Sequence, residues 1–108
     1  MTERQFKIKV GTLRRIKKDL EYYVKEHAVQ QVKIDKMRID GKDENDIRKQ
    51  EEVLVETETM LPDCHSRLKE AATDVKNFIK AHQDEVKLLE TYKEAEELLV
   101  AILTLPPQ

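Results

Sequence analysis

Cys64 and the histidine that follows it are the residues of this chain whose chemistry could support nucleophilic catalysis. A cysteine nucleophile needs a lowered pKa and a nearby partner, and His65 is its neighbour in the sequence. On a helix, however, the side chains of adjacent residues point about 100° apart. Cys64 is also the only cysteine, so an internal disulfide is impossible. We therefore interpret Cys64 as a small buried apolar residue.

His27 and His82 are the other residues that could bind a metal, but the chain has neither HxxxH nor CxxC spacing. A metal needs several converging ligands, so a histidine in or beside the core is the simpler interpretation. The acidic pairs at 51–52 and 96–97 are interpreted as exposed charge, because nothing indicates a cleft that would separate their pKa values. The chain also lacks a glycine-rich phosphate loop. We expect no catalytic residue, no metal and no cofactor, and predict that the chain is not an enzyme.

The spacing of the apolar residues indicates long helices. Every seventh residue of the first half belongs to one apolar-leaning series, and a second series runs through the second half. This spacing is the a position of a heptad, which is typical of helices that lie side by side along a narrow seam. The first series is Phe6, Leu13, Leu20, His27 and Ile34, and the second is Ile47, Leu54, Leu61, Leu68, Val75 and His82.

Composition agrees with a single helical domain, residues 1–108, with a thin core. Charged and hydrophobic residues each make up 39% of the chain, which has only two glycines and three prolines. The net charge of -2 lacks the basic excess of nucleic-acid-binding proteins, so we expect no nucleic acid as partner. The N-terminus lacks the apolar stretch of a signal peptide, and the longest apolar run, 98–103, is too short to cross a bilayer. We expect a cytoplasmic protein without membrane contact.

The first helix is predicted over about 3–39 and the second over about 45–81. Gly41 supplies the left-handed residue that ends many helices, and Asp43 or Asn45 is expected to cap the second helix. Gly11 weakens the first helix, and its missing side chain would let a neighbour approach closely. Pro62 interrupts the second helix without changing the heptad phase, so a kink is predicted there.

A third helix is predicted over about 85–104, with Asp84 as its cap. A second helix continued to Leu103 would be about 90 Å long, against about 55 Å for the first, and would leave a row of leucines in water. The expected fold is therefore an all-α, antiparallel, coiled-coil-like three-helix bundle. The apolar residues at 98–103 surround the whole helix, so the bundle cannot bury them completely; they form either a partner-binding patch or a cover for the bundle end. In this third helix the apolar stripe has a different heptad phase from that of the second, with Val86, Leu89 and Leu103 alongside it; its residues are Leu88, Tyr92, Ala95, Leu99 and Ile102.

Several stretches of the chain are similar to one known family. The segment Met60-Leu61-Pro62-Asp63-Cys64, followed by Arg67-Leu68 and Glu70-Ala71-Ala72, resembles the centre of tubulin-binding cofactor A. The resemblance covers nearly the whole chain in order, but it departs at residues 21–31 and after Glu96. Three further stretches agree with it: Ile8-Lys9 with Gly11 and Arg15; Lys36-Met37-Arg38 followed by Asp46-Ile47 and Lys49-Gln50; and Tyr92-Lys93-Glu94-Ala95.

This resemblance implies a small three-helix bundle that acts as a folding cofactor after the chaperonin. Such a protein captures quasi-native β-tubulin, uses no nucleotide, and hands its client to other tubulin-folding cofactors that build the α/β heterodimer. It would be a monomer associated with the cytoskeleton. Heptads alone leave open a homo-oligomeric coiled-coil scaffold, and a thiol-dependent activity at Cys64 is a second rival. The residues expected to contact β-tubulin are Tyr22, Pro62, Asp63, Arg67, Lys93 and Glu94.

Overall fold

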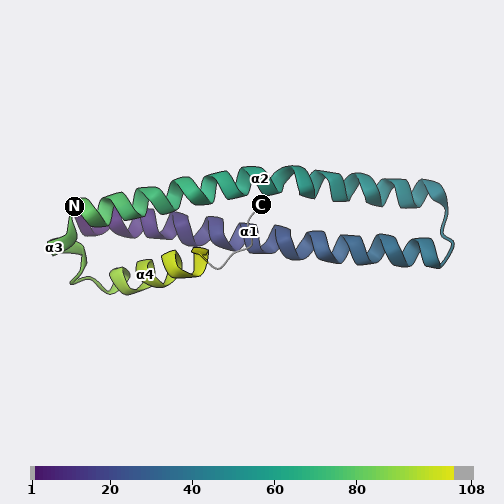
Figure 1. The fold of residues 1–108 in the computed structure, drawn as a ribbon. Helices are drawn as coiled ribbons and strands as arrows, with labels where there is room; N and C mark the ends of the chain where they lie inside the picture. Colours follow the sequence, from purple (N-terminus) through teal and green to yellow (C-terminus); the bar gives the residue numbers. More distant parts are fainter. Residues whose placement is uncertain (1, 104–108) are drawn as a thin grey trace.

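Two long helices form an antiparallel hairpin, and a short arm folds back along less than half of it (Figure 1). The computed structural model describes residues 2–103. Helix α1 spans Thr2–Ile39 and α2 spans Glu44–Ala81, in agreement with the predicted bounds. The molecule measures 62 × 20 × 17 Å, and its radius of gyration of 18.8 Å exceeds the roughly 13 Å of a compact domain of this length. The protein is therefore a rod with a large surface for its mass.

The turn between the two helices uses the residues that the sequence indicated. Gly41 has φ of +70°, and its N–H donates to the carbonyl of Arg38 at 3.2 Å. The N–H of Lys42 donates to the carbonyl of Met37 at 3.0 Å, which completes the Schellman motif that ends many helices. Asp43 then caps α2, because its carboxylate accepts a hydrogen bond from the N–H of Asn45 at 2.9 Å.

The core lies in the half of the hairpin where α1 begins and α2 ends. Phe6 is fully buried there and stacks on Phe78 with 5.8 Å between ring centroids. Val86 closes this end of the seam and is also fully buried. The other buried members of the core are Val10, Leu13, Leu20, Cys64, Leu68, Ala72, Val75 and Ala95. Half of these eight, namely Leu13, Leu20, Leu68 and Val75, come from the predicted a series, so the heptad marks part of the buried side.

The return arm differs from the single helix that was predicted over 85–104. It consists of one helical turn, α3 (Gln83–Val86), and then α4 (Glu90–Leu103), with residues 87–89 between them. Asp84 lies inside α3 and does not cap it, because the residue at the cap position is His82. Leu88 was expected on the buried stripe but is 83% exposed, since the break turns Leu89 toward the core in its place. Thr104, the predicted last helical residue, lies outside the described residues.

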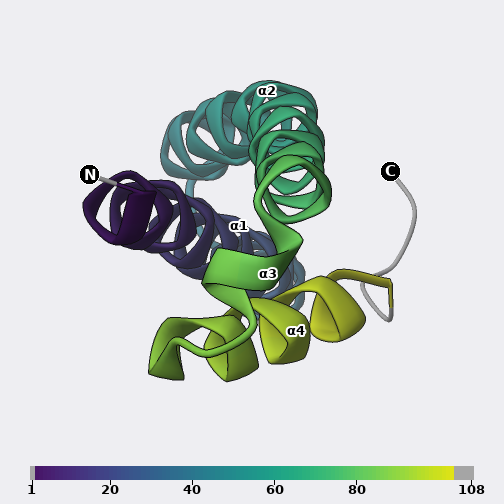
Figure 2. The same cartoon turned by 90° about the vertical axis from the view of Figure 1, so that its left-hand side faces the viewer.

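Helix α4, with 14 residues against 38 in α1, covers less than half of the hairpin. It contacts α1 and runs in the same direction, so it lies antiparallel to α2, and Figure 2 shows it beneath α1 in the end view. Its partly buried residues Leu98, Leu99 and Ile102 pack against the core. Beyond its end, α1 and α2 pair without a third helix (Figure 1). The bundle is thus three helices thick at one end and two at the other.

Pro62 lies within α2, which continues as one helix from Glu44 to Ala81. Proline has no N–H to donate to the carbonyl of Glu58, so one intrahelical hydrogen bond is absent at this level. The kink predicted at this residue stays a prediction. In residues 2–103, no helix combines the length and the apolar character that crossing a bilayer requires.

Candidate partner-binding surfaces

Four of the six residues predicted to contact a partner lie near the middle of the hairpin. The contacts Lys9–Asp74 (2.8 Å) and Gln30–Thr57 (3.0 Å) bracket this level on the two helices. Tyr22 lies on α1 within this bracket and is 60% exposed. On α2, the residues Pro62, Asp63 and Arg67 are also exposed. These four residues therefore lie at one level along the rod, which we call the mid-hairpin region, but on two different helices.

Local contacts hold these exposed side chains in place. Arg67 donates to the carboxylate of Asp63 at 3.2 Å, one helical turn away. Both side chains are about two-thirds exposed, so the pair contributes little to folding stability and stays accessible to a partner. The Tyr22 ring packs edge-to-face on the half-buried Tyr23, with 5.5 Å between centroids. Tyr22 is thus the surface tyrosine of this pair, and Tyr23 packs against the core.

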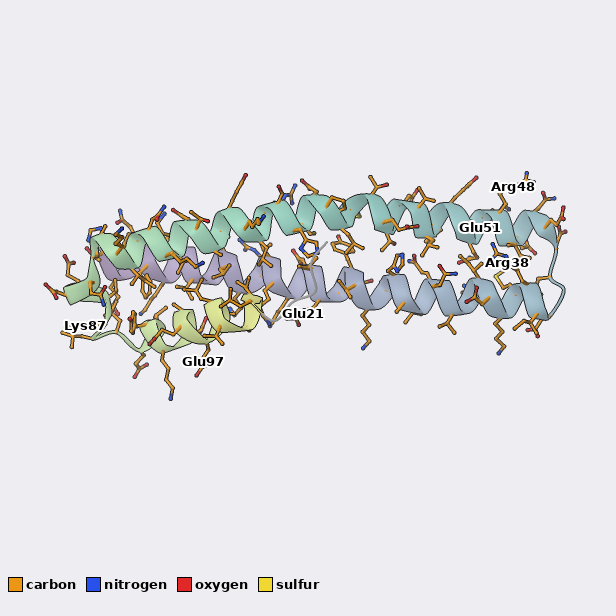
Figure 3. All side chains as sticks on the ribbon, viewed as in Figure 1. Glu21, Arg38, Arg48, Glu51, Lys87 and Glu97 are labelled. Carbon is orange, nitrogen blue, oxygen red and sulfur yellow. The ribbon has the colours of Figure 1, made fainter. Side chains whose placement is uncertain are left out.

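The other two predicted residues lie on α4, apart from this region. Lys93 is exposed and has no ion pair among the described residues. Glu94 forms an ion pair with Arg14 of α1, so part of its role is to hold α4 against the hairpin. Figure 3 shows the nearby Glu97 pointing away from the hairpin. The six residues consequently form two regions and not one continuous patch.

Cys64 is buried in the seam beneath the mid-hairpin region, with 7% of its surface exposed. Burial raises the pKa of this thiol, and the negative charge of Asp19 raises it further. A raised pKa keeps the thiol protonated at neutral pH, which is the opposite of what a nucleophile needs. The described residues hold no group of three or more His, Cys, Asp and Glu side chains arranged for a metal. The interpretation of Cys64 as a buried apolar residue is confirmed.

The hollows on the described surface are shallow grooves. One of about 600 Å³ lies between α2 and the end of α4 and has Ala72, Lys76 and Ile102 in its lining. Another of about 460 Å³ lies on α1 around Gly11, whose missing side chain opens it. A Cβ at Gly11 would meet only the Arg14 guanidinium at 3.5 Å, so no neighbouring helix requires this glycine. The predicted close approach of a neighbour at Gly11 is therefore wrong.

One surface feature was missed in the sequence: the side of α1 that faces away from α2. We call it the α1 outer face; it comprises the residues alternately four and three apart from Arg4 to Ile39. All of its residues are exposed except Gly11, which is half-buried. Its eleven positions are Arg4, Ile8, Gly11, Arg15, Lys18, Tyr22, Lys25, Val29, Val32, Lys36 and Ile39. It thus holds five cations, four β-branched aliphatic residues and a tyrosine, but no acid.

The corresponding rows of α2 have the opposite character. Their eleven positions, the α2 outer face, carry four acids, two lysines and otherwise small polar residues, with no apolar residue. They are Asn45, Lys49, Glu52, Glu56, Thr59, Asp63, Ser66, Glu70, Thr73, Asn77 and Lys80. Because both faces are exposed, solvation alone does not explain the apolar residues on α1. These residues occupy the c and f positions of the heptad, which lie opposite the seam. A comparison of the two helices at these positions would have revealed the difference in apolar and charged residues from the sequence.

Sequence and fold both match one family. A family model described as tubulin binding cofactor A matches residues 1–99. The chain belongs to the tubulin binding cofactor A family. It is 39% identical over 99 residues to the tubulin-specific chaperone A of Oryctolagus cuniculus, which covers 92% of this chain and 91% of that protein.

Solved structures of the tubulin binding cofactor A family share this architecture. The crystal structure of tubulin folding cofactor A from Arabidopsis thaliana superposes with a TM-score of 0.85 at 34% identity, covering 96% of this chain and 97% of that one. The human tubulin chaperone cofactor a gives a TM-score of 0.80 at 39% identity, covering 95% and 99% of the two chains. The resemblance found in the sequence is therefore confirmed. The family match ends at residue 99, so the exposed Val100 and Leu103 lie beyond it.

Proposed function

We propose that this chain is a tubulin-folding cofactor. It captures quasi-native β-tubulin after the chaperonin releases it, stabilises it, and hands it to other tubulin-folding cofactors for assembly of the α/β-tubulin heterodimer. Membership in the tubulin binding cofactor A family carries the proposal, since relatives named tubulin-specific chaperone A match over nine-tenths of the chain. The role belongs to the cytoplasm and its cytoskeleton, and it needs no nucleotide.

The shape of the protein supports this role. A rod 62 Å long with shallow grooves offers its side walls to a large folded client, and the described residues form no cluster suited to a metal. Mixed charge on those walls favours fast encounter and reversible, salt-sensitive binding. The core between α1, α2 and α4 is filled by the chain's own residues, which favours a monomer.

The candidate contact residues are the exposed groups of the two regions described above. Tyr22 supplies an accessible aromatic ring, of the kind that often anchors protein interfaces. Asp63 and Arg67 supply a charged pair at the same level on α2, with Pro62 next to Asp63 in the sequence. Lys93 supplies an unpaired cation on α4, and Glu94 contributes through its contact with Arg14.

Capture of chaperonin-released β-tubulin by the purified chain, measured on native gels without added nucleotide, tests the proposal. A complex of one chain with one β-tubulin is the expected product. Tyr22→Ala and the pair Asp63→Ala with Arg67→Ala should weaken capture while leaving the helical signal unchanged. Lys33→Ala, an exposed change on α1 outside both regions, is the control. If no complex forms, the proposed function is wrong; if the alanine variants bind normally, these contact residues are wrong.

The alternative is a homo-oligomeric scaffold whose seam serves self-association. Sedimentation at micromolar concentration separates the two proposals, because the cofactor should sediment near 12.7 kDa. A stable dimer or larger assembly would favour the scaffold. For the thiol-dependent rival, Cys64→Ala is the decisive variant, and we expect it to capture β-tubulin normally.

A further inference from the structure

We propose that the α1 outer face is a docking surface for an acidic amphipathic helix of the client protein. The inference rests on the proposed function for the identity of the client, but the chemistry of the face identifies what kind of segment it accepts. The face runs along α1 from Arg4 to Ile39, which is about 53 Å at the usual helical rise. Helix α4 leaves it uncovered, since α4 packs on a different side of α1 (Figure 2).

The aliphatic residues on this face are mostly exposed in the described chain. Ile8 and Val29 are more than half exposed, Val32 is 67% exposed, and Ile39 is 85% exposed. β-Branched residues are weaker helix formers than the lysine, glutamate or glutamine that usually occupy exposed helical positions. Residues that lower helix propensity and stay more than half exposed indicate a surface that another molecule covers.

The charges on the face determine the sign of its partner. Arg15, Lys18, Lys25 and Lys36 form no ion pair with any described residue, whereas Lys17 next to the face pairs with Glu21. Figure 3 likewise shows Arg38 outside the face directed at Glu51 of α2, and their side chains lie 3.1 Å apart. These four cations of the α1 outer face are therefore not neutralised by an acid of their own chain. They favour a partner segment rich in carboxylates.

The shape of the face suits a helix as the partner segment. Its residues recur at alternating steps of four and three, the spacing with which two helices align along a seam. A partner helix with apolar residues at its a and d positions would cover Tyr22, Val29 and Val32, and carboxylates beside them would reach Lys18 and Lys25. The hollow at Gly11 gives room for one large side chain of that helix.

Two other occupants fit the face less well. A second copy of this chain would have to offer an acidic surface with apolar residues along most of the face. The α2 outer face has acids and no apolar residue, and α4, which exposes Glu97, Val100 and Leu103, has only 14 residues. An anionic membrane takes up a helix whose apolar residues form a continuous strip with the cations beside it. Here cations stand in the same rows as the apolar residues, with Lys25 between Tyr22 and Val29, so no strip forms.

Two double variants test the α1 outer face, one its charge and the other its apolar residues. Lys18→Glu with Lys25→Glu reverses two unpaired cations on either side of Tyr22. Val29→Gln with Val32→Gln removes two exposed aliphatic residues and introduces better helix formers, so the fold should not weaken. Lys69→Glu with Lys76→Glu is the matched control, because these are also exposed, unpaired lysines inside a long helix and change the net charge equally.

Two probes are titrated against each protein: β-tubulin released from the chaperonin, and a synthetic helix of about four heptads with leucine at a and d and glutamate at e and g. We expect both face variants to bind each probe at least tenfold more weakly than the unsubstituted chain, and the control to stay within twofold. The same peptide with lysine at e and g should not bind. Equal binding of the glutamate peptide to the unsubstituted chain and the face variants overturns the inference.

The two probes separate this inference from the proposed function. If β-tubulin is captured equally by all variants, the function stands and the docking face is wrong. If the glutamate peptide binds the face but β-tubulin is not captured at all, the docking chemistry stands and the client is wrong. Two further outcomes would overturn the inference. If the unsubstituted chain binds phosphatidylserine vesicles and the Lys18→Glu, Lys25→Glu variant does not, the occupant of the face is a membrane. If the unsubstituted chain sediments as a dimer and this variant as a monomer, the occupant is a second copy.

Discussion

Thr57 donates a hydrogen bond to the side-chain oxygen of Gln30 at 3.0 Å, with both residues buried in the seam between α1 and α2. The Gln30 amide in turn donates to Glu26 at 3.4 Å. This polar layer lies in the half of the hairpin that α4 leaves uncovered. A buried polar pair in a two-helix seam weakens hydrophobic packing but disfavours other registers and unwanted self-association. The thin half of the hairpin thus holds its register by hydrogen bonding as well as by packing.

Replacing Thr57 by valine should lower the free energy of unfolding by about 1–3 kcal/mol, because the buried oxygen of Gln30 loses its donor. Adding Gln30→Leu should recover most of this loss, since the seam then becomes apolar on both sides. Urea unfolding of the two variants measures both effects. Sedimentation of the double variant should show increased self-association, as expected if the polar layer limits it. A single variant as stable as the unsubstituted chain would show that the hydrogen bond contributes nothing.

Gly11→Ala should raise the free energy of unfolding by about 0.5–1 kcal/mol. A glycine inside a helix costs backbone entropy that alanine does not, and the added methyl group would make only an ordinary contact with Arg14 at 3.5 Å. Thermal unfolding followed by circular dichroism measures the change. A lower midpoint would mean that the chain itself needs the glycine, contrary to the open space around it.

Gly41→Ala should have the opposite effect and lower the free energy of unfolding by about 1–2 kcal/mol. Its φ of +70° is a left-handed conformation that disfavours any side chain, although no atom lies within 4 Å of the position of a Cβ. The cost is therefore conformational and not steric. Gly41→Asn serves as the control and should fall between glycine and alanine, because asparagine tolerates this conformation better. Equal stability of all three proteins would contradict the role of Gly41 in ending α1.

Cys64 should react slowly with iodoacetamide at neutral pH. Burial first, and then the charge of Asp19, raise the pKa of this thiol, so the reactive thiolate is scarce in the folded protein. Because the folded-state pKa is the higher one, the unfolded chain loses this proton first as pH rises. The associated stability is thus complete below the ordinary pKa of a thiol and is lost as pH rises through the raised value. Alkylation rates and urea unfolding across alkaline pH measure both effects, and Cys64→Ala should show a smaller alkaline loss.

The candidate surfaces were only partly accessible from the sequence. Tyr22, which the sequence named as a contact residue, lies on the surface, while its neighbour Tyr23 packs against the core. The pairing of Glu94 with Arg14 was not accessible from the sequence, since it joins residues 80 positions apart on two helices. The α1 outer face was visible in principle, but exposed aliphatic residues become unusual only once the structure shows that no other helix covers them.

Sequence alone determined the hairpin. The heptad series, the left-handed Gly41 and the Asp43 cap are local signals, and each acts within a few residues of itself. Only the tertiary structure decided the return arm, because residues 81–89 contain no strong helix breaker. The break after Val86 arises from packing: Val86 closes the end of the core and Leu89 turns inward, while Leu88 is left in solvent. How far α4 reaches, and therefore which walls of the rod stay open, depends on these long-range contacts.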